Sequence, residues 1–251
     1  IAARASHSGS AWRKLRYLAS GSYRQGDGDF PFKHYLNGTD HVRQNNDGRR
    51  GELLLKGDLL ASDTWQVGII DDLALSERGA PGILDSPCTS ARQWDMRNLA
   101  ALRATRYDLL HPGSRLDMTL SHRYGEAHFS QPCRWNRESH TVGHDAGISA
   151  TFALPLGETG RLDAGVELQE ELIIDRLTGD ERIIEGGGAD RFSAGLWAAS
   201  SINMFGGHFT LVPAVRLAAA TGQGAAMVPK IGLVLRPLLW TGNRLLSALS
   251  V

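Results

Sequence analysis

The sequence lacks the features that mark several common protein classes. Its formal net charge is zero, with 27 basic and 27 acidic residues, whereas a nucleic-acid-binding protein is expected to be basic with its charge clustered. It has neither a Gly-x-Ser-x-Gly nor a His-Glu-x-x-His motif, so no catalytic constellation stands out. Its nine prolines are scattered, unlike those of a proline-rich linker. We therefore expect no enzyme activity, no cofactor and no nucleic-acid partner.

Long uncharged runs are also scarce. Residues 193–215 contain no Asp, Glu, Lys or Arg, and the run is long enough to cross a bilayer as a helix. However, it includes Asn203 and Pro213 as well as the Phe205-Gly206-Gly207 run, which break a helix. We therefore predict two strands joined by a turn at 205–207.

What the chain does contain is a regular alternation of short turns and longer polar loops. The short turns are predicted near residues 62–63, 111–113, 156–160, 205–207 and 240–242. The longer loops lie near residues 24–49, 76–91, 127–140, 176–189 and 221–226. Short turns on one rim and long loops on the other are typical of a transmembrane β-barrel.

The segments between these turns alternate apolar with polar residues, as β-strands do. Eleven strands are predicted, at about 11–23, 50–60, 64–75, 92–107, 115–126, 141–155, 161–175, 190–203, 208–220, 228–237 and 244–251. The strand at 92–107 alternates poorly between Leu99 and Leu102, which predicts a β-bulge.

Alternation alone does not separate a soluble sandwich from a membrane barrel, because both have one apolar and one polar face. Three observations favour the barrel. The strands are long compared with the usual length of about five or six residues, the connections are short at one end of the strands and long at the other, and the polar face carries fully charged side chains. The apolar face is then expected to point outward. It includes Ile148, Leu162, Val166, Leu211 and Leu233. We predict an all-β, antiparallel up-and-down transmembrane β-barrel.

Aromatic residues lie near the predicted strand ends, as in the aromatic girdles of such barrels, although aromatic residues also favour strands in general. Those expected toward the short-turn rim are Trp65, Tyr107, Phe152, Phe209 and Trp240, and those nearer the other rim are Trp12, Tyr23, Tyr124 and Phe192.

Three stretches of the sequence resemble the barrel of TonB-dependent outer-membrane receptors. The first is Gly-Asp-Gly-Asp-Phe-Pro-Phe at 26–32, followed by Asn-Gly-Thr at 37–39 and Arg-Gln-Asn-Asn-Asp at 43–47. The second is Ser-Glu-Arg-Gly-Ala-Pro-Gly at 76–82, and the third is Pro-Lys-Ile-Gly-Leu-Val-Leu-Arg-Pro at 229–237. Their order and spacing together carry the resemblance.

The resemblance implies that residues 1–251 are a partial receptor barrel. Such receptors have an N-terminal plug domain and about 22 strands, whereas this chain shows no plug or coupling box and about eleven strands. It is therefore expected to be roughly the first half of the barrel, without the C-terminal strands. An open half-barrel leaves unpaired strand edges in lipid, so the chain is not expected to work alone.

The implied function is transport across the outer membrane of a Gram-negative bacterium. The receptor would bind a scarce nutrient, such as a siderophore or cobalamin, at its extracellular loops. A TonB-type energy-coupling protein would then energise uptake through the missing N-terminal region. Two alternatives remain open: a barrel without a transport role, such as an adhesin or structural protein, and a barrel enzyme.

The first long loop offers aromatic and arginine side chains, which stack on planar groups and grip carboxylates. The predicted ligand-binding residues are Phe30, Phe32, Tyr35, Arg43, Arg49 and Arg50. The histidines His34, His41, His128, His140 and His144, in or beside long loops, lack tight metal-ligand spacing. We therefore expect no metal site.

Cys88 and Cys133 are the only cysteines. Both fall in predicted long loops, after the third and fifth strands, so they would lie in neighbouring loops on one rim. Because the exterior of the outer membrane permits disulfides, we predict a Cys88–Cys133 bridge, with two unpaired thiols as the alternative.

Overall fold

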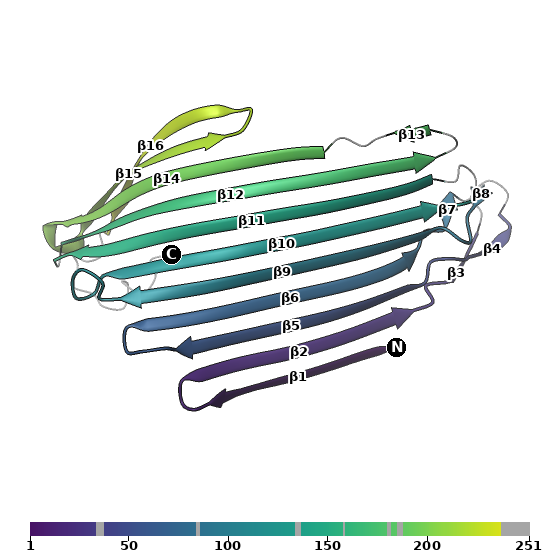
Figure 1. Ribbon diagram of the computed structural model, residues 1–251, viewed down its shortest axis with the longest axis horizontal. Coiled ribbons are helices and arrows are strands. Elements are labelled where there is room, and N and C mark those ends of the chain that lie inside the picture. The colour runs from purple at the N-terminus through teal and green to yellow at the C-terminus, as the bar shows by residue number, and fades with distance from the viewer. Residues whose placement is uncertain are drawn as a thin grey trace.

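The computed structural model describes residues 1–33, 38–83, 86–133, 137–157, 159–179, 182–184 and 188–236. One antiparallel sheet dominates, and eleven of its strands follow one another in chain order (Figure 1). They are β1 (Ala2–Ala11), β2 (Leu15–Gly26), β5 (Gly48–Leu60), β6 (Trp65–Gly79), β9 (Arg92–Tyr107), β10 (Arg115–Gln131), β11 (Arg137–Leu156), β12 (Gly160–Gly179), β14 (Gly188–Met204), β15 (Phe209–Ala220) and β16 (Gly224–Leu235).

The remaining elements are small and belong to the connections. β13 (Arg182–Ile184) pairs with β12, while β3 (Phe30–Lys33) with β4 (Asp40–Arg43), and β7 (Gly82–Ile83) with β8 (Ser86–Pro87), form two separate hairpins. Both hairpins lie at the same end of the sheet (Figure 1). A 3-10 turn, η1 (Phe205–Gly207), joins β14 to β15. In the described residues no helix is long and apolar enough to cross a membrane.

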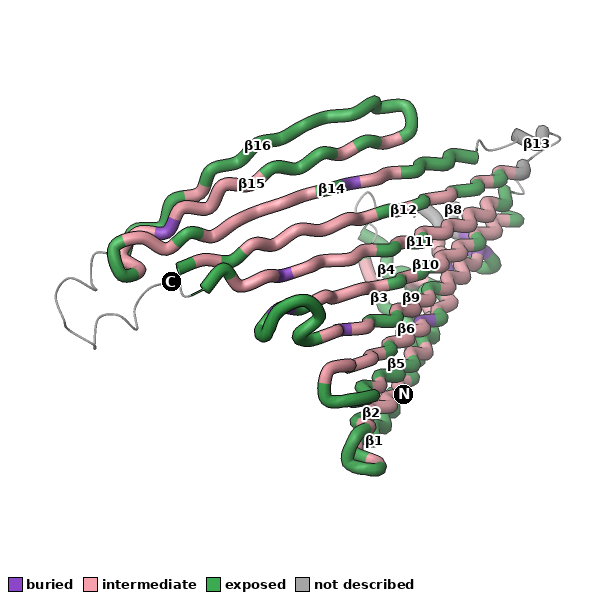
Figure 2. The backbone as a smooth tube through the Cα atoms, turned by 60° about the vertical axis from the view of Figure 1, so that its left-hand side comes forward, coloured by how far each residue is buried: buried purple, intermediate pink, exposed green. Residues whose placement is uncertain are grey.

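The sheet is curved and open. Figure 2 shows that it curls along the strand order, with β1 and β16 at opposite edges. Among the described residues, no strand pairs with the outer edge of either β1 or β16. Such edges expose a row of unpaired backbone donors and acceptors, which cannot persist in lipid.

Local chemistry explains why the short turns form. Between β9 and β10, Asp108 accepts a hydrogen bond from the Gly113 amide (2.6 Å), and the Ser114 hydroxyl oxygen accepts from His111 (3.3 Å). Gly113 has φ +83°, a conformation in which glycine carries no steric penalty. The predicted turns at 62–63, 111–113 and 205–207 are confirmed, and the charge-free run at 193–215 forms two strands rather than a helix.

The prediction was wrong at two turns. The strand expected at 11–23 is interrupted by a turn at 12–14, so that β1 precedes it. Trp12 and Arg13 adopt φ +51° and +58°, which is uncommon for such residues, and Trp12 consequently lies on the short-turn rim rather than the opposite one. The loop expected at 221–226 is instead a tight turn, in which Gly222 and Gly224 have positive φ (76° and 77°).

Two further expectations concern single strands. The bulge predicted in 92–107 is absent, because β9 pairs in unbroken register with both β6 and β10. The strand predicted at 244–251 and the turn at 240–242, with Trp240, lie outside the described residues.

Register fixes which side chains share a face. Leu102 lies opposite Leu120, Leu120 opposite Ile148, and Ile148 opposite Leu168, so these four form one apolar row across β9 to β12. Among the described residues, no second sheet or helix covers these side chains, and Leu120 and Ile148 remain 55% and 52% exposed. The prediction of one open sheet with an alternating apolar face is therefore confirmed. The soluble-sandwich alternative is not supported, because no second sheet packs on this face among the described residues.

The opposite, polar face carries charged side chains in register. Arg103 pairs with Asp117 at 2.8 Å, Arg123 with Asp145 at 3.6 Å, and Arg191 with Glu171 at 2.6 Å. Exposed pairs of this kind contribute only about 0–1 kcal/mol each, so they do not make a core. They instead suit a wet interior, and this face is hollowed across β10 to β16.

Candidate ligand-binding rim

The long connections gather at the end of the sheet that carries the β3–β4 hairpin (Figure 1). In this hairpin Phe30 lies opposite Arg43 and Phe32 opposite His41, so these four side chains share one face. The Phe32 and His41 rings stack with centroids 5.8 Å apart, and Phe30 meets Phe32 edge-on at 6.4 Å. The structure therefore brings three predicted ligand residues together, while a fourth, Tyr35, lies outside the described residues.

The other two predicted ligand residues are separated. Arg49 and Arg50 are consecutive in β5, so their side chains point to opposite faces of the sheet. Arg49 pairs with Glu77 at 2.5 Å on the same face as the apolar rows, whereas Arg50 pairs with Glu52 at 2.6 Å on the polar face. Only Arg50 is thus placed on the face expected to line a barrel interior.

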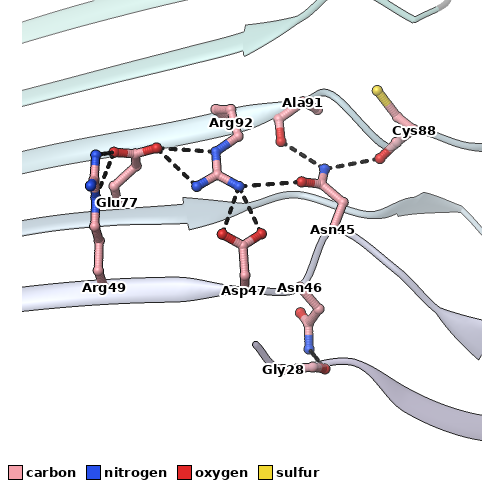
Figure 3. Close-up of polar contacts among 9 residues, drawn as sticks. All are labelled: Gly28, Asn45, Asn46, Asp47, Arg49, Glu77, Cys88, Ala91 and Arg92. Carbon is pink, nitrogen blue, oxygen red and sulfur yellow. Dashed lines mark hydrogen bonds and ion pairs between the residues drawn. The ribbon is translucent and has the colours of Figure 1, made fainter. Parts of the chain in front are cut away.

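A cluster around Arg92 holds the first long loop (Figure 3). Arg92 donates hydrogen bonds to both carboxylate oxygens of Asp47 (2.7 and 2.9 Å) and to Glu77 (2.8 Å). The hydrogen bonds from Arg92 hold the pKa of Asp47 below its ordinary value of 3.8. This contribution to stability is therefore complete above about pH 4 and is lost as the pH falls through the lowered pKa.

Asn45 continues this attachment into the next loop. Its side-chain nitrogen donates to the carbonyl oxygens of Cys88 (3.0 Å) and Ala91 (2.8 Å), as Figure 3 shows. Its backbone adopts φ +58°, which asparagine tolerates better than most residues. The Gly79 amide donates to the Asp47 carbonyl oxygen at 2.8 Å. The loop after β2 is thus fixed to the loop after β6.

Cys88 and Cys133 form a disulfide, with their Cα atoms 5.6 Å apart. The bond links the connection after β6 to the connection after β10. Since Asn45 binds the Cys88 carbonyl, three successive long connections are joined on this rim. The β3–β4 hairpin therefore projects from connections that are held to one another.

The arrangement matches that of solved outer-membrane proteins. The siderophore receptor PirA from Pseudomonas aeruginosa superposes with a TM-score of 0.62 at 14% identity, covering 94% of this chain and 38% of PirA. The outer membrane transporter YddB from Escherichia coli gives 0.66 at 11% identity, covering 91% and 35%. BauA, the ferric preacinetobactin receptor from Acinetobacter baumannii, gives 0.63 at 10% identity, covering 94% and 43%.

The chain has the fold of an outer-membrane receptor barrel. The resemblance to TonB-dependent receptors is thereby confirmed at the level of fold. The chain spans less than half the length of each of these proteins. No family model matches the sequence, and no curated protein matches it.

The Arg-Gln-Asn-Asn-Asp run at 43–47 is visible in the sequence, but the attachment of Asn45 and Asp47 to the neighbouring connection was not predicted. The residue types gave an indication, because Asn and Asp side chains favour turns and form hydrogen bonds with nearby backbone groups. Arg92 was missed because nothing in the sequence shows that β9 and the loop before β5 lie side by side; that proximity depends on the strand order.

His128, His140 and His144 prove to be residues of the long strands β10 and β11, and His41 lies in the short strand β4, whereas His34 is outside the described residues. His140 contacts Glu126 at 2.8 Å, and His144 lies 5.6 Å from the His122 ring, all on the β10–β11 hairpin. Within the described ranges, no group of three or more His, Cys, Asp or Glu side chains could hold a metal ion.

Proposed function

We propose that this chain is part of the transmembrane barrel of an outer-membrane transport receptor of a Gram-negative bacterium. The receptor binds a scarce nutrient at the long-loop rim and takes it up with energy from a TonB-type coupling protein. The observation that carries the proposal is the combination of one apolar face, one charged face and a cross-linked long-loop rim on a single curved sheet.

The nature of the neighbours supports a nutrient ligand. PirA is a siderophore receptor and BauA a receptor for ferric preacinetobactin. We propose the same broad class of ligand here, a siderophore or a comparable nutrient such as cobalamin. One face of the β3–β4 hairpin carries two aromatic rings and Arg43, with Phe30 exposed and Phe32 and Arg43 half-buried. These are groups that stack on and pair with such molecules.

The open sheet supports the proposal that residues 1–251 are part of a larger barrel. Both outer edges need partner strands before the sheet can lie in a bilayer. The matched structures are more than twice as long as the chain, which leaves ample length for those strands and for a plug domain.

The test uses the complete receptor in the outer membrane. Replacing Phe30, Phe32 and Arg43 together with alanine removes the ligand-facing side of the hairpin but keeps Asn45 and Asp47. We expect nutrient binding to weaken about tenfold or more, since each lost ring or charge contact contributes roughly 1 kcal/mol. Loss of the coupling protein should abolish uptake but leave binding intact.

The matched control replaces Val42 and Lys33, which lie on the other face of the same hairpin. These changes should leave binding unchanged. If the triple variant binds the nutrient with the same affinity as the control variant, the hairpin has no ligand role. If the intact receptor takes up no nutrient, or takes it up without the coupling protein, the transport proposal fails, and an adhesin, a structural barrel or a barrel enzyme becomes the better account.

A further inference from the structure

Four arginines gather on the polar face near the long-loop rim. Arg24 of β2 lies directly opposite Arg50 of β5, and Arg78 of β6 and Arg97 of β9 lie on the same face close by. Together they line a hollow of about 820 Å³ that also includes Asp95. We call this hollow the arginine pocket.

The arginine pocket differs from the polar face of the later strands in how its charges are balanced. Elsewhere on that face, Arg103, Arg123 and Arg191 each lie within 4 Å of a carboxylate. In the part of the chain that the structure describes, neither Arg24 nor Arg97 has an ion pair or a side-chain hydrogen bond.

The neighbouring polar groups do not remove this surplus of positive charge. Arg78 donates hydrogen bonds to the amide oxygen of Gln93, the shorter at 2.8 Å, and Arg50 pairs with Glu52. Glu77, which also lines the hollow, is already paired with Arg49 and Arg92. Asp95 accepts hydrogen bonds from Gln93 (2.9 Å) and Ser76 (3.4 Å) instead of from an arginine. Hydrogen-bond donors of the guanidinium groups therefore remain available.

Like charges directly opposite one another on a sheet are unfavourable. Glu52 attracts both Arg24 and Arg50, but it is one carboxylate beside two guanidinium groups, and a bound anion would offset the remaining positive charge. A guanidinium group has five N–H donors in a fixed fork, which matches two oxygens of one carboxylate or phosphate group. Several such forks around one hollow suit a molecule with more than one acidic group.

We propose that the arginine pocket binds the acidic groups, carboxylate or phosphate, of the transported nutrient. This inference rests on the proposed transport function and adds the chemical class of the ligand. The pocket opens where β2 ends and β5 begins, so it lies beside the loop that carries the β3–β4 hairpin. A ligand that enters past the hairpin would reach the arginines next.

The experiment titrates the complete receptor with two probes, citrate and pyrophosphate, at low ionic strength. Replacing Arg24 and Arg97 with alanine should weaken binding of the preferred probe at least about tenfold, because two charge-assisted contacts are lost. Replacing both with lysine keeps the charge but not the fork, so binding should be intermediate. The control, Lys56→Ala with Lys230→Ala, removes two charges from the same face and should change affinity less than about twofold.

A second measurement separates a nutrient site from a site for a free anion. The preferred probe should compete with uptake of the nutrient, and the Arg24→Ala/Arg97→Ala variant should lose both binding and uptake. If the intact receptor binds neither probe, if the control loses as much affinity, or if the probe does not compete, the inference is overturned while transport stands. Absence of nutrient uptake by the intact receptor refutes the transport function itself.

Discussion

Replacing Ala150 with arginine is expected to prevent stable insertion of the complete barrel. Ala150 lies opposite Met118 on one side and Val166 on the other, within the apolar face of β10 to β12. An arginine on a lipid-facing strand position costs up to about 2–4 kcal/mol, and the cost is greatest near the bilayer midplane. Unfolding of the receptor from lipid vesicles by denaturant should report a loss of this size, together with a lower yield in the outer membrane.

The adjacent residue provides the control. Ser149 lies opposite Thr119 and Glu167 on the polar face, so Ser149→Arg adds the same side chain at the same depth but toward the wet interior. Its free energy of unfolding should change by less than about 1 kcal/mol. Equal losses for the two variants would contradict the assignment of the faces.

Replacing Gly79 with alanine is expected to detach the first long loop. A Cβ atom at Gly79 would lie 2.2 Å from the carbonyl oxygen of Asn45 and 2.6 Å from its carbonyl carbon, and backbone atoms cannot yield as a flexible side chain can. The loop should move off β6 and lose the contacts of Asn45 and Asp47. Overpacking of this kind costs about 1–3 kcal/mol, or roughly 5- to 150-fold in the population of the detached loop.

Limited proteolysis of residues 27–47 measures this detachment, because cleavage follows the population of the open form. Gly51→Ala is the matched control: it lies in the neighbouring strand β5, where a Cβ atom would meet nothing within 4 Å. Cleavage should accelerate in the first variant only. Unchanged cleavage in Gly79→Ala would mean that the loop is not held by these contacts.

Much of the fold could be predicted because a barrel strand repeats one simple pattern. In residues 161–169, Leu162, Ala164, Val166 and Leu168 alternate with polar residues, and this period of two defines both the strand and its faces. The strand order followed as well, because short hairpin connections pair each strand with the next.

The errors arose where local sequence does not carry the signal. The turn at 12–14 has no Gly, Pro, Asn or Asp, and Trp12 takes a positive φ that its side chain does not predict. Conversely, Gly222 and Gly224 suggested a long loop but form a tight turn. Arg49 and Arg50 were grouped because they are adjacent in sequence, although adjacency within a strand places them on opposite faces.

The rim could be predicted only in part. The aromatic content of the β3–β4 hairpin was visible in the sequence, but its shared face depends on the register of Phe30 with Arg43. The Arg92 cluster and the arginine pocket each combine residues from separate strands, so they emerge only when strand order and register are known.

The most direct test of the central claim, that one face of this sheet meets lipid and the other an aqueous interior, is a fluorescence scan of β11. Single cysteines are introduced one at a time at residues 145–152 of the complete receptor in lipid vesicles and labelled with an environment-sensitive probe; Cys88 and Cys133 are bonded to each other and should not react. Brominated lipid should quench the even positions, which include Ile148 and Ala150, and an aqueous quencher should reach the odd ones. Quenching that does not alternate between neighbouring residues would contradict the account.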